Sequence, residues 1–124
     1  MRIAVVSDLH AFDSNTWNTD GSPSHYDVSS VKPPTHCPVG SLFNLIDTMS
    51  MTADILLCPG DFANHACASS LPKAWAAINE IGRKLSAGLI VGTVGNHDVD
   101  SRHLHNTYDP IESLKLLTPL FPIN

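Results

Sequence analysis

Three short apolar runs in the chain are unbroken, without the alternation of apolar and polar residues that marks a half-exposed strand. They span residues 3–6, 55–58 and 89–91, and the third continues to residue 94. Continuous runs of this length are typical of strands buried on both faces of a parallel sheet. The runs therefore predict an α/β fold in which helices cover such a sheet.

Two segments between these runs have apolar side chains at helical spacing, residues 40–49 and residues 72–85. In the second segment Pro72 lies in the first turn, where its missing N–H costs little, and Gly88 follows the end. A shorter helix is predicted at residues 110–117, before Pro119 and Pro122. The predicted order is a mainly parallel β-α-β-α-β sheet flanked by helices.

The 124 residues are enough for a single domain, which we assign to residues 1–124. Residues 11–39 contain many polar residues and four prolines without any periodicity, so they are predicted to form a long loop insertion. This loop leaves the carboxyl end of the first predicted strand. Loops in that position are often functional lids or mobile insertions.

Composition narrows the functional classes. The net charge is −5, and the seven Lys and Arg residues form no basic run, so nucleic acid is expected only as a substrate. The three cysteines, Cys37, Cys58 and Cys67, fit neither a disulfide framework nor a zinc ribbon, which favours the reducing cytoplasm. No segment has the roughly 18 consecutive apolar residues of a membrane span.

Side chains that can bind metals follow each apolar run. They are Asp8 and His10 after the first run, Asp61 and Asn64 after the second, and Asn96, His97 and Asp98 after the third. Ligands of open α/β sheets bind outside the carboxyl ends of the strands, so these clusters are expected to meet at one edge. Asp8 and His10 are two residues apart, and on an extended chain both would point toward one ion.

Each cluster alone has a structural explanation. Asp8 could cap a turn after its strand, and Gly60-Asp61 is a common turn pair. The glycines at positions 60 and 95 permit tight turns that aim the following side chains into a cleft. The three clusters together, in this order, are harder to explain by turns.

The clusters spell D-x-H, G-D-x-x-N and G-N-H-D, and in this order the chain resembles the first three motifs of the calcineurin-like metallophosphoesterases. The resemblance implies the N-terminal half of an α/β/β/α sandwich. It also implies that Asp8 and His10 bind a first metal, that Asp61 bridges two metals, and that Asn96 binds the second.

The same resemblance places His97 near the leaving group, with Asp98 orienting its ring. Asn64 would support the site without binding a metal, and His65, which is close to Asp61 in sequence, could line the cleft. Two divalent or trivalent cations roughly 3.5–4 Å apart can hold a phosphate and lower the pKa of a shared water. Mixed oxygen and imidazole ligands suit manganese, iron or zinc. The predicted function is hydrolysis of a phosphomonoester or phosphodiester substrate.

The chain departs from the family pattern after the third motif. The later histidine segments, the last written G-H-x-H, are missing, and His103-Leu104-His105 follows Arg102 where the family has glycine. We therefore expect a truncation, which leaves a non-catalytic metal-binding module or scaffold as the alternative. A homo-oligomer through an unfinished sheet edge is a further expectation. Nucleotides, cyclic nucleotides, nucleic acids and lipid-linked phosphates stay open as substrates.

Overall fold

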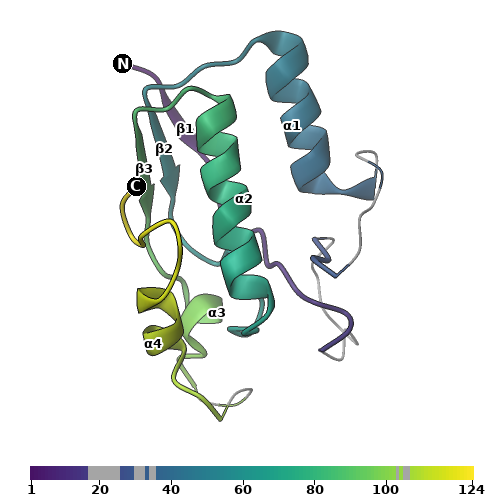
Figure 1. Cartoon of the computed structure of the whole chain (residues 1–124), viewed down its shortest axis with the longest axis vertical. Helices are drawn as coiled ribbons and strands as arrows, with labels where there is room; N and C mark the ends of the chain where they lie inside the picture. Colours follow the sequence, from purple (N-terminus) through teal and green to yellow (C-terminus); the bar gives the residue numbers. More distant parts are fainter. Residues whose placement is uncertain (17–25, 30–32, 34–35, 103, 105–106) are drawn as a thin grey trace.

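The computed structural model describes residues 1–16, 26–29, 33, 36–102, 104 and 107–124. Their elements, in chain order, are β1 (Ile3–Val5), α1 (Pro38–Met49), β2 (Ile55–Cys58), α2 (Ser70–Lys84), β3 (Leu89–Gly92), α3 (Asn96–Val99) and α4 (Pro110–Lys115). The three strands form one parallel sheet in the order β1-β2-β3. Figure 1 shows this sheet on one side of the molecule, with α1 and α2 beside it. The predicted α/β class and parallel β-α-β-α-β order are confirmed.

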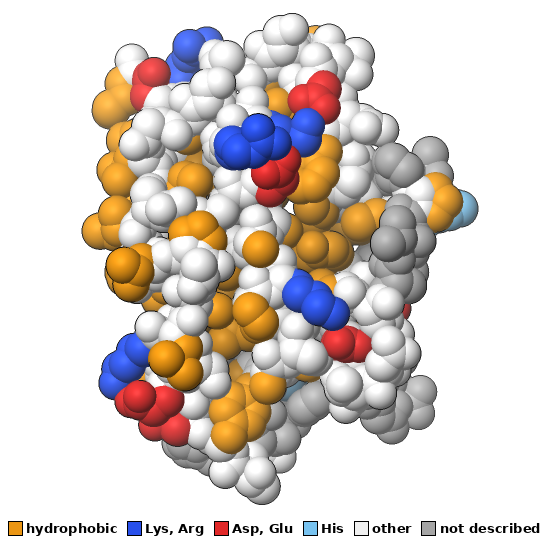
Figure 2. All heavy atoms as spheres, in the orientation of Figure 1, with side chains coloured by type: hydrophobic (Ala, Val, Ile, Leu, Met, Phe, Trp, Pro, Cys, Tyr) orange, Lys and Arg blue, Asp and Glu red, His pale blue; other side chains and the backbone are white. Residues whose placement is uncertain are grey.

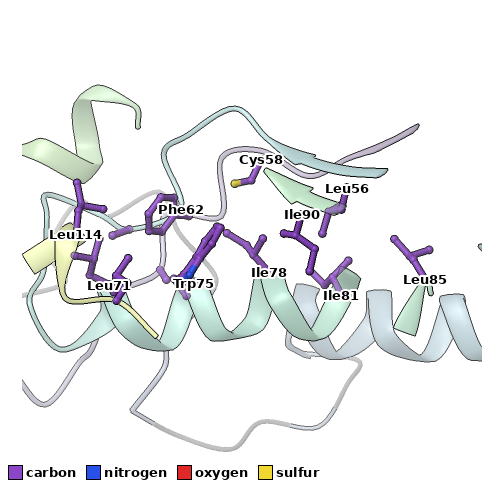
Figure 3. Close-up of a cluster of buried hydrophobic side chains, with 14 of the residues drawn as sticks. Leu56, Cys58, Phe62, Leu71, Trp75, Ile78, Ile81, Leu85, Ile90 and Leu114 are labelled. Carbon is purple, nitrogen blue, oxygen red and sulfur yellow. The ribbon is translucent and has the colours of Figure 1, made fainter. Parts of the chain in front are cut away.

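The core lies between the sheet and α2. Leu56 and Ile90 from the strands point toward Ile78 and Ile81 of the helix, and all four side chains are buried (Figure 3). Gly82 lets the helix approach closely, since a Cβ at this position would lie 2.4 Å from the Cδ1 of Ile90. The apolar residues of 72–85 recur at helical spacing because they form the face of α2 that packs against the sheet.

The other face of the sheet corrects the expectation that the strands are buried on both sides. Register pairs Ile3 with Ile55 and Leu89, so these apolar side chains share one face. Ile3 is 48% exposed and Val5 is 61% exposed. Within the described residues, α2 packs against the opposite face and α1 packs against α2, so neither helix covers this face. Figure 2 shows hydrophobic side chains along the side of the molecule where the sheet lies.

The described part of the long loop is tied to the rest of the fold. Ala11 pairs with Ala63 after β2, and Phe12 pairs with Asp27. Helix α1 begins at Pro38, so the loop prediction for residues 11–39 extended two residues too far. The reason is that Pro38 occupies the first turn of the helix, where proline is well accommodated. Residues 17–25, 30–32 and 34–35 of this loop lie outside the described residues.

The C-terminal residues add to the sheet beside β3. Ile123 forms an antiparallel bridge with Val91, and the backbones of Ile90 and Asn124 exchange two hydrogen bonds of 2.8 and 3.0 Å. The indole Nε1 of Trp75 donates a 2.7 Å hydrogen bond to the carbonyl of Pro119, which holds this segment against α2. In the described part of the chain, no helix is long and apolar enough to cross a membrane.

Candidate metal centre

The loops that follow the three strands meet at the carboxyl edge of the sheet, as predicted for a parallel α/β fold. The backbone N–H of His10 donates to the carbonyl of Asp61 over 2.9 Å, which joins the first loop to the second. The second and third loops touch at two glycines, because a Cβ on Gly60 would lie 2.4 Å from the backbone nitrogen of Gly95. Gly60 also has a φ of +115°, a conformation that side chains strongly disfavour.

Asp8, His10 and Asp61 form a cluster in which one ligand atom of each lies within 4.8 Å of the other two. The Nε2 of His10 is 3.6 Å from the Oδ1 of Asp8. Among the described residues, this is the one group of three or more His, Cys, Asp or Glu side chains close enough to hold an ion. Two residues that follow β1 and one that follows β2 therefore converge on a single point.

The way in which these three residues converge differs from the prediction. Asp8, His10 and Asp61 have φ angles of 58°, 44° and 53°, in the left-handed region rather than in an extended conformation. The two-residue alternation of a strand therefore does not explain why Asp8 and His10 point together. Each such residue costs on the order of 1–3 kcal/mol, and strained residues of this kind gather at functional sites.

His97 connects the cluster to the third loop. Its backbone N–H donates to the Oδ1 of Asp61 over 2.9 Å, and Asn96 immediately precedes it at the start of α3. The ring of His97 lies between two other imidazoles, with centroids 4.6 Å from His10 and 5.0 Å from His65. The three motifs thus meet around Asp61.

Two buried ring nitrogens favour a bound ligand at this place. The Nδ1 atoms of His10 and His97 have no hydrogen-bond partner within the described part of the chain. Leaving a buried polar atom without a hydrogen-bond partner costs about 1–3 kcal/mol of stability. Each of these nitrogens would therefore be stabilised by a bound ligand or by a hydrogen-bond acceptor. Carboxylate oxygens together with imidazole nitrogens fit manganese, iron or zinc. The residues present therefore fit the metal ions that the motifs predict.

The contacts of Asp98 differ from those that the resemblance implies. Its carboxylate accepts hydrogen bonds from the backbone N–H groups of Asp61, Ala63 and Gly95, at 2.7, 2.8 and 2.9 Å. All its described partners are backbone groups of the second and third loops, so these contacts do not support the predicted role of Asp98 in orienting the ring of His97. Burial raises the pKa of Asp98 to about 6, against the opposing effect of these three donors. The carboxylate ties these two loops together from beneath the cluster.

Asn64 and His65 lie on the second loop, beside the cluster. Asn64 is buried, and its backbone N–H donates to the carbonyl of Ala11 over 2.8 Å, so it helps to join the first and second loops. His65 lies in the left-handed region with a φ of 49° and lines a cavity together with Asn96 and His97. Arg102 lines the same cavity, although no sequence pattern assigned it to the site. His103 and His105 lie outside the described residues.

Comparison with known families agrees with the geometry. The sequence matches the family described as calcineurin-like phosphoesterase over residues 1–122. No curated protein matches the chain. Since the matched stretch covers almost all of the sequence and includes all three loops, the chain belongs to the calcineurin-like phosphoesterase family.

Proposed function

We propose that this protein is a metal-dependent phosphoesterase that hydrolyses phosphomonoesters or phosphodiesters. The observation that carries the proposal is the convergence of Asp8, His10 and Asp61 within 4.8 Å at the carboxyl edge of the sheet. Membership of a phosphoesterase family supports the same reaction class. The strained backbone at all three residues adds to this support, because such strain is common at sites of chemistry.

The proposed ligands are those that the resemblance implies, and the proximity of Asp8, His10 and Asp61 supports them. Asp8 and His10 would hold a first ion, Asp61 would be shared, and Asn96 would contribute to a second. Two divalent or trivalent ions bound there, of which manganese, iron and zinc fit the donors best, would lower the pKa of a water and neutralise charge on the phosphate. Asp61 is fixed for this task by the hydrogen bond from the backbone of His97.

His97 is the proposed proton donor to the leaving oxygen. Its ring packs between the imidazoles of His10 and His65, which limits the directions that it can take. Imidazole can donate or accept a proton near neutral pH, as general acid catalysis requires. Asp98 acts as a positioning residue, because it binds the backbone of the loops that carry Asp61 and His97.

A manganese-dependent assay tests the proposal. The purified protein should hydrolyse p-nitrophenyl phosphate when Mn²⁺ is added, and Asp61→Ala should abolish the reaction. Asp47→Ala is the matched control, because it also removes one carboxylate. Asp47 lies on α1, outside the cluster, and its exposed carboxylate forms an ion pair with Lys84. Turnover that survives in Asp61→Ala, or a folded protein inactive with Mn²⁺, Fe²⁺ and Zn²⁺, would overturn the proposal.

A metal-binding module without catalysis is the second candidate. Within the described residues, the cluster supplies three ligands to an ion, and no other acidic, His or Cys side chain joins them. Calorimetry would then show uptake of Mn²⁺ that depends on Asp61, while phosphate esters stay intact. This result would distinguish a metal-binding module from a phosphoesterase.

Two proposals concern the setting of the protein. All three cysteines are free, which supports a reducing compartment such as the cytoplasm. In the described part of the chain β1 is an end strand of the sheet, so its outer backbone groups offer an edge for a second copy. Size-exclusion chromatography with light scattering tests the second proposal, and a strictly monomeric protein at high concentration would refute it.

A further inference from the structure

A cavity of about 230 Å³ lies beside the candidate metal centre. One wall is formed by His65, Asn96 and His97, and the other by the segment that follows α3, which includes Ser101 and Arg102. Pockets for drug-sized ligands span about 300–1,000 Å³, so this cavity has room for one small chemical group. Arg102, one of the residues that line it, is exposed to solvent.

The cavity shares residues with the proposed catalytic machinery. Asn96 and His97 belong both to its wall and to the loop that binds Asp61. A phosphate bound by the cluster would therefore lie next to the cavity, on the side of His97. The group joined to the phosphate through the ester oxygen is the part of a substrate that can occupy this space.

Arg102 gives the wall of this cavity a positive charge. Four other cationic side chains form ion pairs, namely Lys73 with Asp13, Arg83 with Glu80, Lys84 with Asp47, and Lys115 with Glu112. Within the described part of the chain, the side chains of Arg2 and Arg102 form no ion pair, and Arg102 is the one of these two that lines this cavity. Asp100 is the one carboxylate in the cavity wall, but it is 4% exposed and its Oδ1 accepts the backbone N–H of Leu104. Arg102 thus lines the cavity without an ion-pair partner among the described residues, in a protein whose net charge is −5.

We propose that this cavity receives the leaving group and that Arg102 selects phosphate esters whose leaving group carries a second anionic group, a carboxylate or a phosphate. The planar guanidinium can bind either anion through two parallel hydrogen bonds. In the reaction a water oxygen forms the new bond to phosphorus and the water gives up a proton to solvent, the ester P–O bond breaks, and the leaving oxygen takes a proton from His97. This inference rests on the proposed phosphoesterase function, and it narrows the substrate class.

The experiment compares two esters that differ by one charge, 3-carboxyphenyl phosphate and phenyl phosphate, in the presence of Mn²⁺. The ratio of their kcat/KM values should favour the carboxylate ester, and Arg102→Gln should lower this ratio by about tenfold, the effect of one charge-assisted hydrogen bond. Arg102→Lys should restore part of it. Arg83→Gln is the matched control, since it removes the same charge from an exposed pair on α2 and should leave both rates unchanged.

Binding of the corresponding phosphonates, which are not hydrolysed, gives a second readout by calorimetry with Mn²⁺ present. The dissociation constants should show the same preference for the carboxylate compound and the same loss in Arg102→Gln. An equal ratio in the parent protein and in Arg102→Gln, in rates or in binding, refutes the role of Arg102. If neither ester is hydrolysed, the proposed phosphoesterase function is refuted. The role of Arg102 is then tested by the dissociation constants of the two phosphonates alone.

Discussion

Gly95→Ala should disable the metal centre while leaving the fold intact. A Cβ at position 95 would lie 2.0 Å from the Oδ1 of Asp61 and 2.5 Å from its Cγ. Real Cβ atoms essentially never approach other heavy atoms within 3.0 Å, so the carboxylate or the loop must move by about 1 Å. The backbone of Gly95 has a φ of −97° and a ψ of 179°, which alanine adopts freely. The whole effect is therefore steric and is directed at one proposed ligand.

The size of the effect follows from this displacement. A 1 Å misplacement of a catalytic group can cost about 10²-fold in rate, and overpacking of this kind costs about 1–3 kcal/mol of stability. We therefore expect the rate of p-nitrophenyl phosphate hydrolysis with Mn²⁺ to fall by about 10²-fold or more. The dissociation constant for Mn²⁺, measured by calorimetry, should rise in parallel.

Gly88→Ala is the matched control for this experiment. The same methyl group at position 88 would meet its nearest neighbour, the carbonyl oxygen of Asp54, at an ordinary 3.8 Å. Its activity and metal affinity should equal those of the parent protein. Thermal unfolding followed by circular dichroism would show that both variants fold. If folded Gly95→Ala binds Mn²⁺ and turns over substrate like Gly88→Ala, Asp61 is not the ligand that we propose.

Three further outcomes are expected. Asp98→Asn should lower the free energy of unfolding by about 1–3 kcal/mol in urea titrations, because one amide oxygen cannot accept the hydrogen bonds that two carboxylate oxygens accept. Burial raises the pKa of Asp27, but hydrogen bonds from Ser29 and Ser14 outweigh it and bring the pKa well below its usual range. Asp27 should therefore stabilise the protein fully above its unfolded pKa of about 4 and lose this contribution as the pH falls, and Asp27→Asn should flatten that part of the profile. Ile78→Ala should cost about 2–5 kcal/mol and the control Ile111→Ala, at an exposed position, less than about 0.5 kcal/mol.

The sequence was sufficient to predict the three strands and the helices α1, α2 and α4, because each has one dominant cause, but it did not predict the short helix α3. Residues 72–85 repeat apolar side chains at helical spacing, and in the structure the same side chains pack against the sheet. The open face of β1 could not be predicted from the run at residues 3–6. An apolar run shows which side chains avoid water, but it does not show which element of the chain covers them.

The sequence predicted that Asp8, His10 and Asp61 lie together, but it did not predict the geometry of the cluster. Adjacent positions after parallel strands brought Asp8, His10 and Asp61 together, as the general topology of α/β sheets requires. Their left-handed backbone and the three backbone partners of Asp98 depend on how the loops pack against each other. The hydrogen bonds from Asp61 and Ala63 to Asp98 join residues 37 and 35 positions apart, so no local sequence pattern could reveal them.

The position of Asp61 depends on the core as well as on the loops. The next residue, Phe62, is fully buried, and its ring centroid lies 6.0 Å from those of both Trp75 and Phe121. Because the chain between a buried ring and the adjacent carboxylate has little freedom, the packing of α2 fixes the point from which Asp61 reaches the cluster. The strain at Asp61 can persist because this anchor and the hydrogen bond from His97 hold it from two sides. Hydrophobic packing and metal chemistry are therefore coupled through two neighbouring residues, one that points into the core and one that points into the site.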